Sequence, residues 1–140
     1  MHNEIVIINV AFGHLYIEQQ QRLAESIAVN CPGVDTMFWT DELPEGSKPF
    51  KESLYGFKPH AVKAAQNKGY KKIIFLDPAC IVMKPVDYYF TLDFPIMAAR
   101  DDNKLKNHIG DKAVKWYGIK PIPDDWHLVG GSLYVFDFNN

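Results

Sequence analysis

Apolar and polar positions follow two periodicities along the chain, one typical of buried strands and one typical of amphipathic helices. Residues 4–12 and 72–76 form apolar runs rich in β-branched and aromatic side chains, which predict buried strands. Residues 16–30 place apolar side chains at helical spacing opposite a face of Gln and Glu, which predicts an amphipathic helix. Further strands or extended segments are predicted at residues 34–40, 80–83, 93–99 and 131–138.

Proline and glycine mark the limits of a second helix. Lys58-Pro59 begins it, because proline fits the first helical turn, and Gly69 is well placed just past its end. A third helix is predicted at residues 104–117, either continuous or divided at Gly110.

Strands and helices alternate in the first half of the chain, whereas strands dominate the second half. Alternation predicts right-handed parallel crossovers, and the departure from alternation predicts a mixed sheet. The expected fold class is therefore α/β. At 140 residues the chain is expected to form one domain, residues 1–140. Because the sequence ends directly after a predicted strand, we expect that a C-terminal segment of the whole protein is lacking.

Composition narrows the classes of partner. A formal net charge of −2 gives no electrostatic reason to expect nucleic acid or an anionic membrane as partner. The apolar segment at residues 5–12 is too short to span a bilayer and follows no basic residues, so no transmembrane segment is expected. Cys31 and Cys80 have neither metal-ligand spacing nor a disulfide framework, which favours a reducing, cytoplasmic location.

Asp77 is the most conspicuous polar residue, since it ends the apolar run of residues 72–76 and precedes Pro78. Two interpretations are open. Ligands of open α/β sheets bind outside the carboxyl ends of strands, so Asp77 is a candidate ligand-binding residue. Aspartate before proline also commonly opens a turn.

Four segments resemble, in sequence order, the GT-A glycosyltransferases. Residues 69–82 (GYKKIIFLDPACIV), followed by KPVD, resemble their Asp-x-Asp region. Residues 127–137 (HLVGGSLYVFD) look like the Asn-Ala-Gly strand of family 8 and related transferases. Residues 10–16 (VAFGHLY) resemble the first strand-to-helix turn, and residues 55–59 (YGFKP) resemble a helix start in bacterial and phage relatives. The resemblance covers essentially the whole chain and implies a three-layer GT-A-like fold with a mixed, mainly parallel central sheet.

The implied activity is transfer of a sugar from a nucleoside-diphosphate sugar to an unknown glycan, protein or small-molecule acceptor. The chain departs from the family pattern at Ala79, which replaces the second Asp, and at Val129, which replaces Asn. Ala79 favours the alternative of a non-catalytic relative that binds nucleotide or carbohydrate. A third possibility is an unrelated nucleotide-binding module such as a nucleotidyltransferase, but the chain has no glycine-rich phosphate loop.

The resemblance implies a set of residues that bind the nucleotide-sugar. Asp77 is the candidate ligand of Mn²⁺ or Mg²⁺; whether a metal binds is open, since Mg²⁺ retains waters and uses substrate phosphates. Lys58 lies at a helix N-terminus, where it either binds the diphosphate or is simply solvated. Phe12 and Tyr16 are candidates for stacking on the base, although Tyr16 also fits the buried face of its helix. The expected nucleotide-sugar-binding residues are Phe12, Tyr16, Lys58, Asp77, Ala79, Gly130 and Gly131.

Two carboxylates are candidate catalytic residues. Asp101 belongs to a charged cluster that follows a predicted strand and is placed to meet the sugar or the acceptor. Asp125 precedes the glycine pair and is a candidate general base if the enzyme inverts the anomeric configuration. The charged cluster with Asp101 is equally compatible with a solvated turn.

Overall fold

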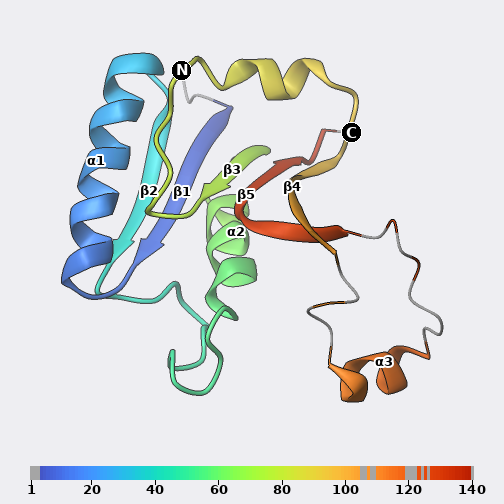
Figure 1. The fold of residues 1–140 in the computed structure, drawn as a ribbon. Coiled ribbons are helices and arrows are strands. Elements are labelled where there is room, and N and C mark those ends of the chain that lie inside the picture. Colours follow the sequence, from blue (N-terminus) through green and yellow to red (C-terminus); the bar gives the residue numbers. More distant parts are fainter. Residues whose placement is uncertain are drawn as a thin grey trace.

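The computed structural model describes residues 4–104, 107, 110–118, 123, 125 and 127–139. The elements in chain order are β1 (Ile5–Ala11), α1 (His14–Asn30), β2 (Asp35–Thr40), α2 (Phe57–Asn67), β3 (Lys72–Leu76), the 3-10 helix η1 (Asp87–Thr91), β4 (Ile96–Lys104), α3 (Asp111–Tyr117) and β5 (His127–Asp137). The strands form one five-stranded sheet in the order β2-β1-β3-β5-β4 (Figure 1).

The sheet is mixed, as the sequence predicts. β1 pairs in parallel with both β2 and β3, whereas β5 pairs antiparallel with β3 and with β4. Four strands therefore run in one direction and β5 runs against them. The predicted α/β class and the mixed, mainly parallel sheet are confirmed.

Helices cover both faces of the sheet because side chains alternate along its central strands. Ile7 of β1 packs in one apolar cluster with Leu23 of α1. The next residue, Ile8, packs in a second cluster with Ala61 of α2. In Figure 1, α1 and α2 accordingly lie on opposite sides of β1 and β3. The apolar runs at residues 4–12 and 72–76 are continuous because both of their faces are covered.

A buried polar network ties β1 to its neighbours. The Asn9 side chain is fully buried, and its Nδ2 donates to the Leu76 carbonyl at 2.6 Å. Gln20 Nε2 of α1 donates to Asn9 Oδ1 at 2.7 Å and to the Trp39 carbonyl at 3.1 Å. Thr40 Oγ1 donates to Gln20 Oε1 at 2.6 Å. These bonds hold β1, β2, β3 and α1 in register at the end of the sheet where Asp77 follows.

The chain turns from β1 into α1 at Gly13. Its φ of 79° lies in the region that favours glycine. The Gly13 N–H donates to Asp41 Oδ1 at 2.8 Å, and the Asp41 N–H donates to the Ala11 carbonyl at 2.9 Å. The ends of β1 and β2 are thereby tied together, and the first turn of α1 lies over the carboxyl end of the sheet.

The predicted extended segment at residues 80–83 is not a strand. It belongs to an irregular connection that leads to η1. Val82 and Val86 are buried. The Val82 N–H donates to Ser26 Oγ at 3.0 Å, and its carbonyl accepts a bond from Asn30 Nδ2 at 2.9 Å. Because α1 satisfies these backbone groups, the segment follows the helix instead of joining the sheet.

The predicted helix at residues 104–117 is confirmed only for its second part, Asp111–Tyr117. Gly110 has the extended conformation that precedes the helix, so the predicted break at Gly110 is confirmed, whereas Lys104 belongs to β4 and not to a helix. The cause is long-range pairing: Arg100 pairs with Val129 and Lys104 with His127, which carries β4 through the charged cluster. The same pairing starts β5 four residues before the predicted residue 131. Residues 105, 106, 108 and 109 lie outside the described part of the chain.

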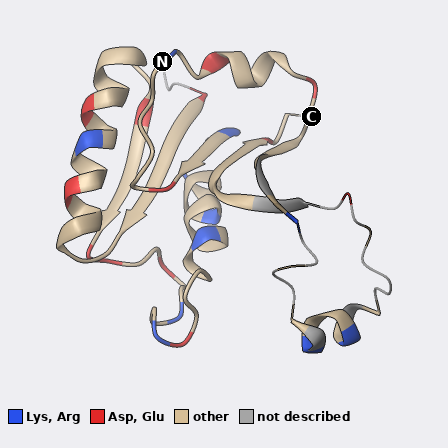
Figure 2. Ribbon diagram, in the orientation of Figure 1, with Lys and Arg blue, Asp and Glu red and all other residues tan. Residues whose placement is uncertain are grey.

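The charged residues, the cysteines and the helix lengths complete the description of the fold. Figure 2 shows that the charged residues among those described lie mainly on helices and loops, with few on the strands. Both cysteines are free thiols, with Cys31 buried and Cys80 half-buried. Within the described ranges, no helix is both long and apolar enough to cross a bilayer.

Replacing Tyr70 by phenylalanine is expected to lower the free energy of unfolding by about 1 kcal/mol near neutral pH, the usual net value of a hydrogen bond. The Tyr70 hydroxyl donates to Asp35 Oδ2 at 2.8 Å. That bond, burial and the charge of Asp35 all raise the pKa of Tyr70 above its ordinary 10.0. A raised pKa in the folded state means that the contribution is present below pH 10 and is lost as the pH rises further.

The measurement is urea unfolding of both proteins from pH 7 upward. The difference between wild type and Tyr70→Phe should shrink above pH 10. A difference that stays constant through that range would contradict the assigned hydrogen bond.

Candidate functional site

A hollow of about 260 Å³ lies where β1 and β3 end and where α1 and α2 begin. This is the carboxyl edge of the parallel strands, where α/β sheets bind ligands. Its wall is mainly aromatic and apolar, with one ammonium and one carboxylate. The residues lining it are Val10, Phe12, Tyr16, Phe50, Tyr55, Phe57, Lys58, Asp77, Pro78 and Ala79.

The structure brings together, in this hollow, five of the seven residues expected to bind a nucleotide-sugar. Phe12 follows β1 directly, and Tyr16 lies in the first turn of α1. Lys58 lies in the first turn of α2, while Asp77 and Ala79 follow β3. Parallel strands and their crossover helices place these separate segments at one edge of the sheet, so residues as far apart in the sequence as Phe12 and Ala79 line the same hollow.

Lys58 and Asp77 form the polar centre of the hollow. Lys58 Nζ lies 3.2 Å from Asp77 Oδ1, and it donates to the Gly131 carbonyl at 2.5 Å. The same nitrogen lies over the Phe75 ring, 4.9 Å from its centroid, and 5.6 Å from the Tyr134 ring centroid. The Lys58 side chain is only 16% exposed, against 36% for Asp77. A half-buried ion pair within aromatic walls is the result.

The glycine pair has two different environments. Gly131 contributes its carbonyl to Lys58, and a Cβ atom on it would lie 3.3 Å from Lys58 Nζ. Gly130 faces β4, where a Cβ atom would lie 3.2 Å from the Ala99 carbonyl oxygen. Gly131 therefore borders the site, whereas Gly130 allows close approach of two strands.

The aromatic wall includes residues that sequence reasoning missed. Phe50 and Tyr55 come from the loop before α2 and were not among the expected site residues. The Phe50 ring lies 5.9 Å from Phe12 and 6.3 Å from Phe57 between centroids. The sequence signal for these residues is that they are aromatic but lie in a polar loop, where neither a strand nor a helix needs them for its core. Phe12 is thus partly engaged by Phe50, whereas Tyr16 is 53% exposed and free to meet a ligand.

The two candidate catalytic carboxylates are not brought into the hollow by any described contact. Asp125 is exposed, at a turn position between residues outside the description. Asp101 lies in β4, but its side chain is outside the described part of the structure, as is the whole of Asp124. Their catalytic roles stay predictions.

The described donor set does not suit a divalent cation. Among the described residues, no group of three or more His, Cys, Asp or Glu side chains gathers closely enough to hold a metal ion. The Asp77 carboxylate is already paired with the Lys58 ammonium, and Ala79 offers no oxygen ligand. Mg²⁺ and Mn²⁺ prefer several oxygen ligands, so Asp77 alone is a weak protein contribution.

Cys80 lies beside Asp77 and is a protonated thiol at neutral pH. Burial raises the pKa of the Cys80 thiol, and the negative charge of Asp77 raises it further. Its Sγ donates to the Ser132 carbonyl at 3.4 Å. Since the thiolate is the reactive form, Cys80 is structurally part of the turn and not an activated nucleophile.

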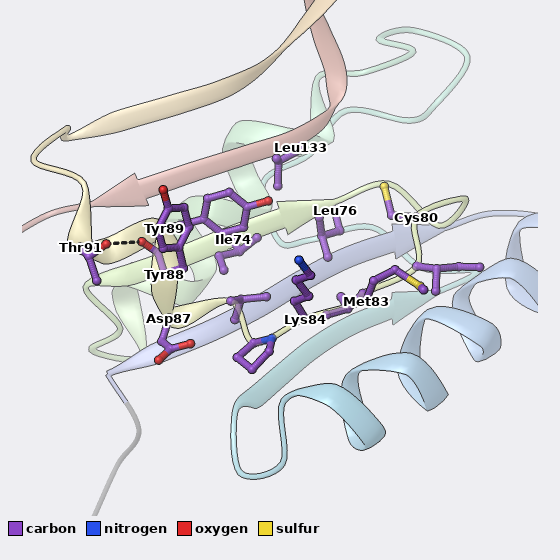
Figure 3. Close-up of a pocket in the computed structure, with 14 residues that line it drawn as sticks. Ile74, Leu76, Cys80, Met83, Lys84, Asp87, Tyr88, Tyr89, Thr91 and Leu133 are labelled. Atoms are coloured by element: carbon purple, nitrogen blue, oxygen red, sulfur yellow. Dashed lines mark hydrogen bonds between the residues drawn. The ribbon is translucent and has the colours of Figure 1, made fainter.

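Two further hollows lie near the site. One of about 560 Å³ shares Tyr55 and Lys58 with the first and extends over Phe75 and Tyr134. A larger one, of about 940 Å³, lies on the α1 side of β3 beneath residues 80–91. Figure 3 shows its apolar wall with Leu76 and Leu133, and the Thr91 hydroxyl bonded to the Tyr88 carbonyl at 2.8 Å. None of the expected site residues lines this larger hollow.

Comparison of the sequence with models of known protein families and with proteins of curated function gives no match. The function is therefore inferred from the residues and their geometry.

Proposed function

We propose that the chain is the donor-binding part of a GT-A-type glycosyltransferase, which transfers a sugar from a nucleoside-diphosphate sugar to a glycan, protein or small-molecule acceptor. One observation carries the proposal. Phe12, Tyr16, Lys58, Asp77 and Ala79, which the sequence resemblance assigns to nucleotide-sugar binding, line a single hollow at the carboxyl edge of the sheet.

The chemistry of the hollow suits a nucleoside diphosphate. Tyr16 and Tyr55 are exposed aromatic side chains that can stack on a base. Lys58 supplies positive charge in the first turn of α2, where the helix dipole also favours anions. A base and a diphosphate can therefore be held by different ends of one hollow.

Lys58 also suits the bond-breaking step. During transfer the bond between the anomeric carbon and the phosphate oxygen breaks, and its electron pair leaves with the nucleoside diphosphate. An ammonium held in a half-buried site stabilises this developing charge better than one in water. Asp77 and the Gly131 carbonyl orient the ammonium through their bonds to it.

A relative that binds nucleotide or carbohydrate without turnover is the second candidate function. Ala79 supports it, because a transferase of this type ordinarily offers a second carboxylate at that position. The two candidates share the binding site and differ only in turnover.

The first test is unfolding of the protein in the presence of UDP-, GDP-, ADP- and dTDP-sugars, each measured with excess Mn²⁺ and with EDTA. At a ligand concentration a hundred times Kd, the ligand that binds should raise the free energy of unfolding by about 2.7 kcal/mol and increase Tm by several degrees. No shift with any of them under either condition would refute the proposal. Sugar release or transfer in the same mixtures identifies the transferase; a shift without turnover identifies the binding relative.

A further inference from the structure

The Lys58 ammonium has the surroundings of a bound cation. A carboxylate oxygen of Asp77 and the carbonyl oxygen of Gly131 lie at 3.2 and 2.5 Å from Nζ. The rings of Phe75, Tyr134 and Tyr55 lie with their centroids 4.9, 5.6 and 5.6 Å away. Oxygen acceptors and aromatic faces are the groups that stabilise a desolvated ammonium. The site is thus already filled by a positive charge that belongs to the chain.

The position of this charge decides what Asp77 can bind. A divalent cation on the Asp77 carboxylate would lie within a few ångströms of the ammonium, and the two positive charges would repel in a half-buried site. Lys58 is held by Gly131 as well as by Asp77, so displacing it breaks two bonds. Ala79 provides no second carboxylate to compensate.

We infer that Lys58 takes the place of a divalent cation in this protein, so that the nucleoside diphosphate binds without a metal. The inference rests on the proposed function and specifies how its donor is held. An ammonium has three N–H donors. Asp77 and Gly131 accept two of them, which leaves one for a phosphate oxygen. Lys58 lines the hollow that contains Tyr16, so a phosphate bound to it can carry its base onto that ring.

Isothermal titration of the whole chain with UDP, GDP, ADP, dTDP and inorganic pyrophosphate tests the inference. We expect the diphosphates that bind to do so with the same Kd, within about threefold, in excess EDTA and in excess Mg²⁺ or Mn²⁺. Pyrophosphate is included because it has the charge of the diphosphate without the base. Binding that requires the metal would overturn this inference and leave the nucleotide-sugar proposal intact. No binding under any condition would overturn both.

Variants of two lysines on α2 sharpen the test. Lys58→Met keeps the apolar stem over the rings and removes the charge, so in EDTA it should weaken binding of both nucleotide and pyrophosphate about 10- to 100-fold. Lys63→Met removes an exposed lysine of the same helix that does not line the Tyr16 hollow, and it should leave Kd unchanged. Equal effects of the two variants would overturn the inference. If Lys58→Met does not fold, the comparison of EDTA with metal in the wild-type protein still decides it.

Discussion

Replacing Tyr16 by alanine is expected to weaken binding of the nucleoside diphosphate about 10- to 100-fold, the loss usual for one aromatic side chain stacked on a base. Tyr16 is 53% exposed and borders the hollow beside Phe12 and Lys58. Because so much of its ring is exposed to water, its removal should change the free energy of unfolding by only about 0.5 kcal/mol. Titration calorimetry measures the first effect, and urea unfolding measures the second.

Pyrophosphate distinguishes base stacking from a general disturbance of the site. The Tyr16→Ala variant should bind pyrophosphate as the wild type does, because only the base has lost its partner. Tyr88→Ala is the matched control, since Tyr88 is also exposed but lines a different hollow, on the α1 side of β3. Equal losses for nucleotide and pyrophosphate in Tyr16→Ala would rule out a stacking role.

Replacing Asn9 by leucine is expected to lower the free energy of unfolding by about 2–4 kcal/mol, the largest effect on stability that we predict. The change removes the donor to the Leu76 carbonyl and the acceptor for one N–H of Gln20 Nε2, whose other N–H keeps its bond to the Trp39 carbonyl; the two unpaired groups stay buried. Unsatisfied buried polar groups each cost about 1–3 kcal/mol. Leucine has the same branched heavy-atom shape as asparagine, so the change leaves no cavity.

Urea unfolding of Asn9→Leu should show a lower midpoint with an unchanged slope. Asn67→Leu, at the exposed end of α2, is the control, and its stability should stay within about 0.5 kcal/mol of wild type. Equal stability of Asn9→Leu and wild type would mean that the network is not needed for folding. The Leu76 carbonyl immediately precedes Asp77, so nucleotide binding measured on the folded variant also shows whether the network positions the site.

The sequence predicts the central elements of this fold well. The strand at residues 72–76 has the predicted bounds, and α1 begins only two residues before the predicted residue 16. Such elements are predictable because their own sequence shows which side chains are buried. In β3 a continuous apolar run indicates burial of both faces, and in α1 an apolar stripe indicates burial of one face. The α/β class follows from their alternation.

Elements decided by distant partners are predicted poorly. The segment at residues 80–83 is apolar enough for a strand, but its backbone groups bond to Ser26 and Asn30 of α1. Helical spacing after residue 104 suggests a longer helix, but Lys104 pairs with His127 of β5. In both cases a partner more than 20 positions away overrides the local pattern.

Local sequence pattern suffices to place Asp77 at the carboxyl end of a buried strand and Lys58 at the start of a helix. It does not show that the two side chains meet, because neither periodicity nor spacing encodes a contact across 19 positions. The crossover from α2 to β3 makes that contact, and the antiparallel return of β5 adds the Gly131 carbonyl from 73 positions away. The chemical character of the site, a carboxylate already neutralised by a lysine in place of an open metal ligand, arises only when the sheet assembles these segments at one edge.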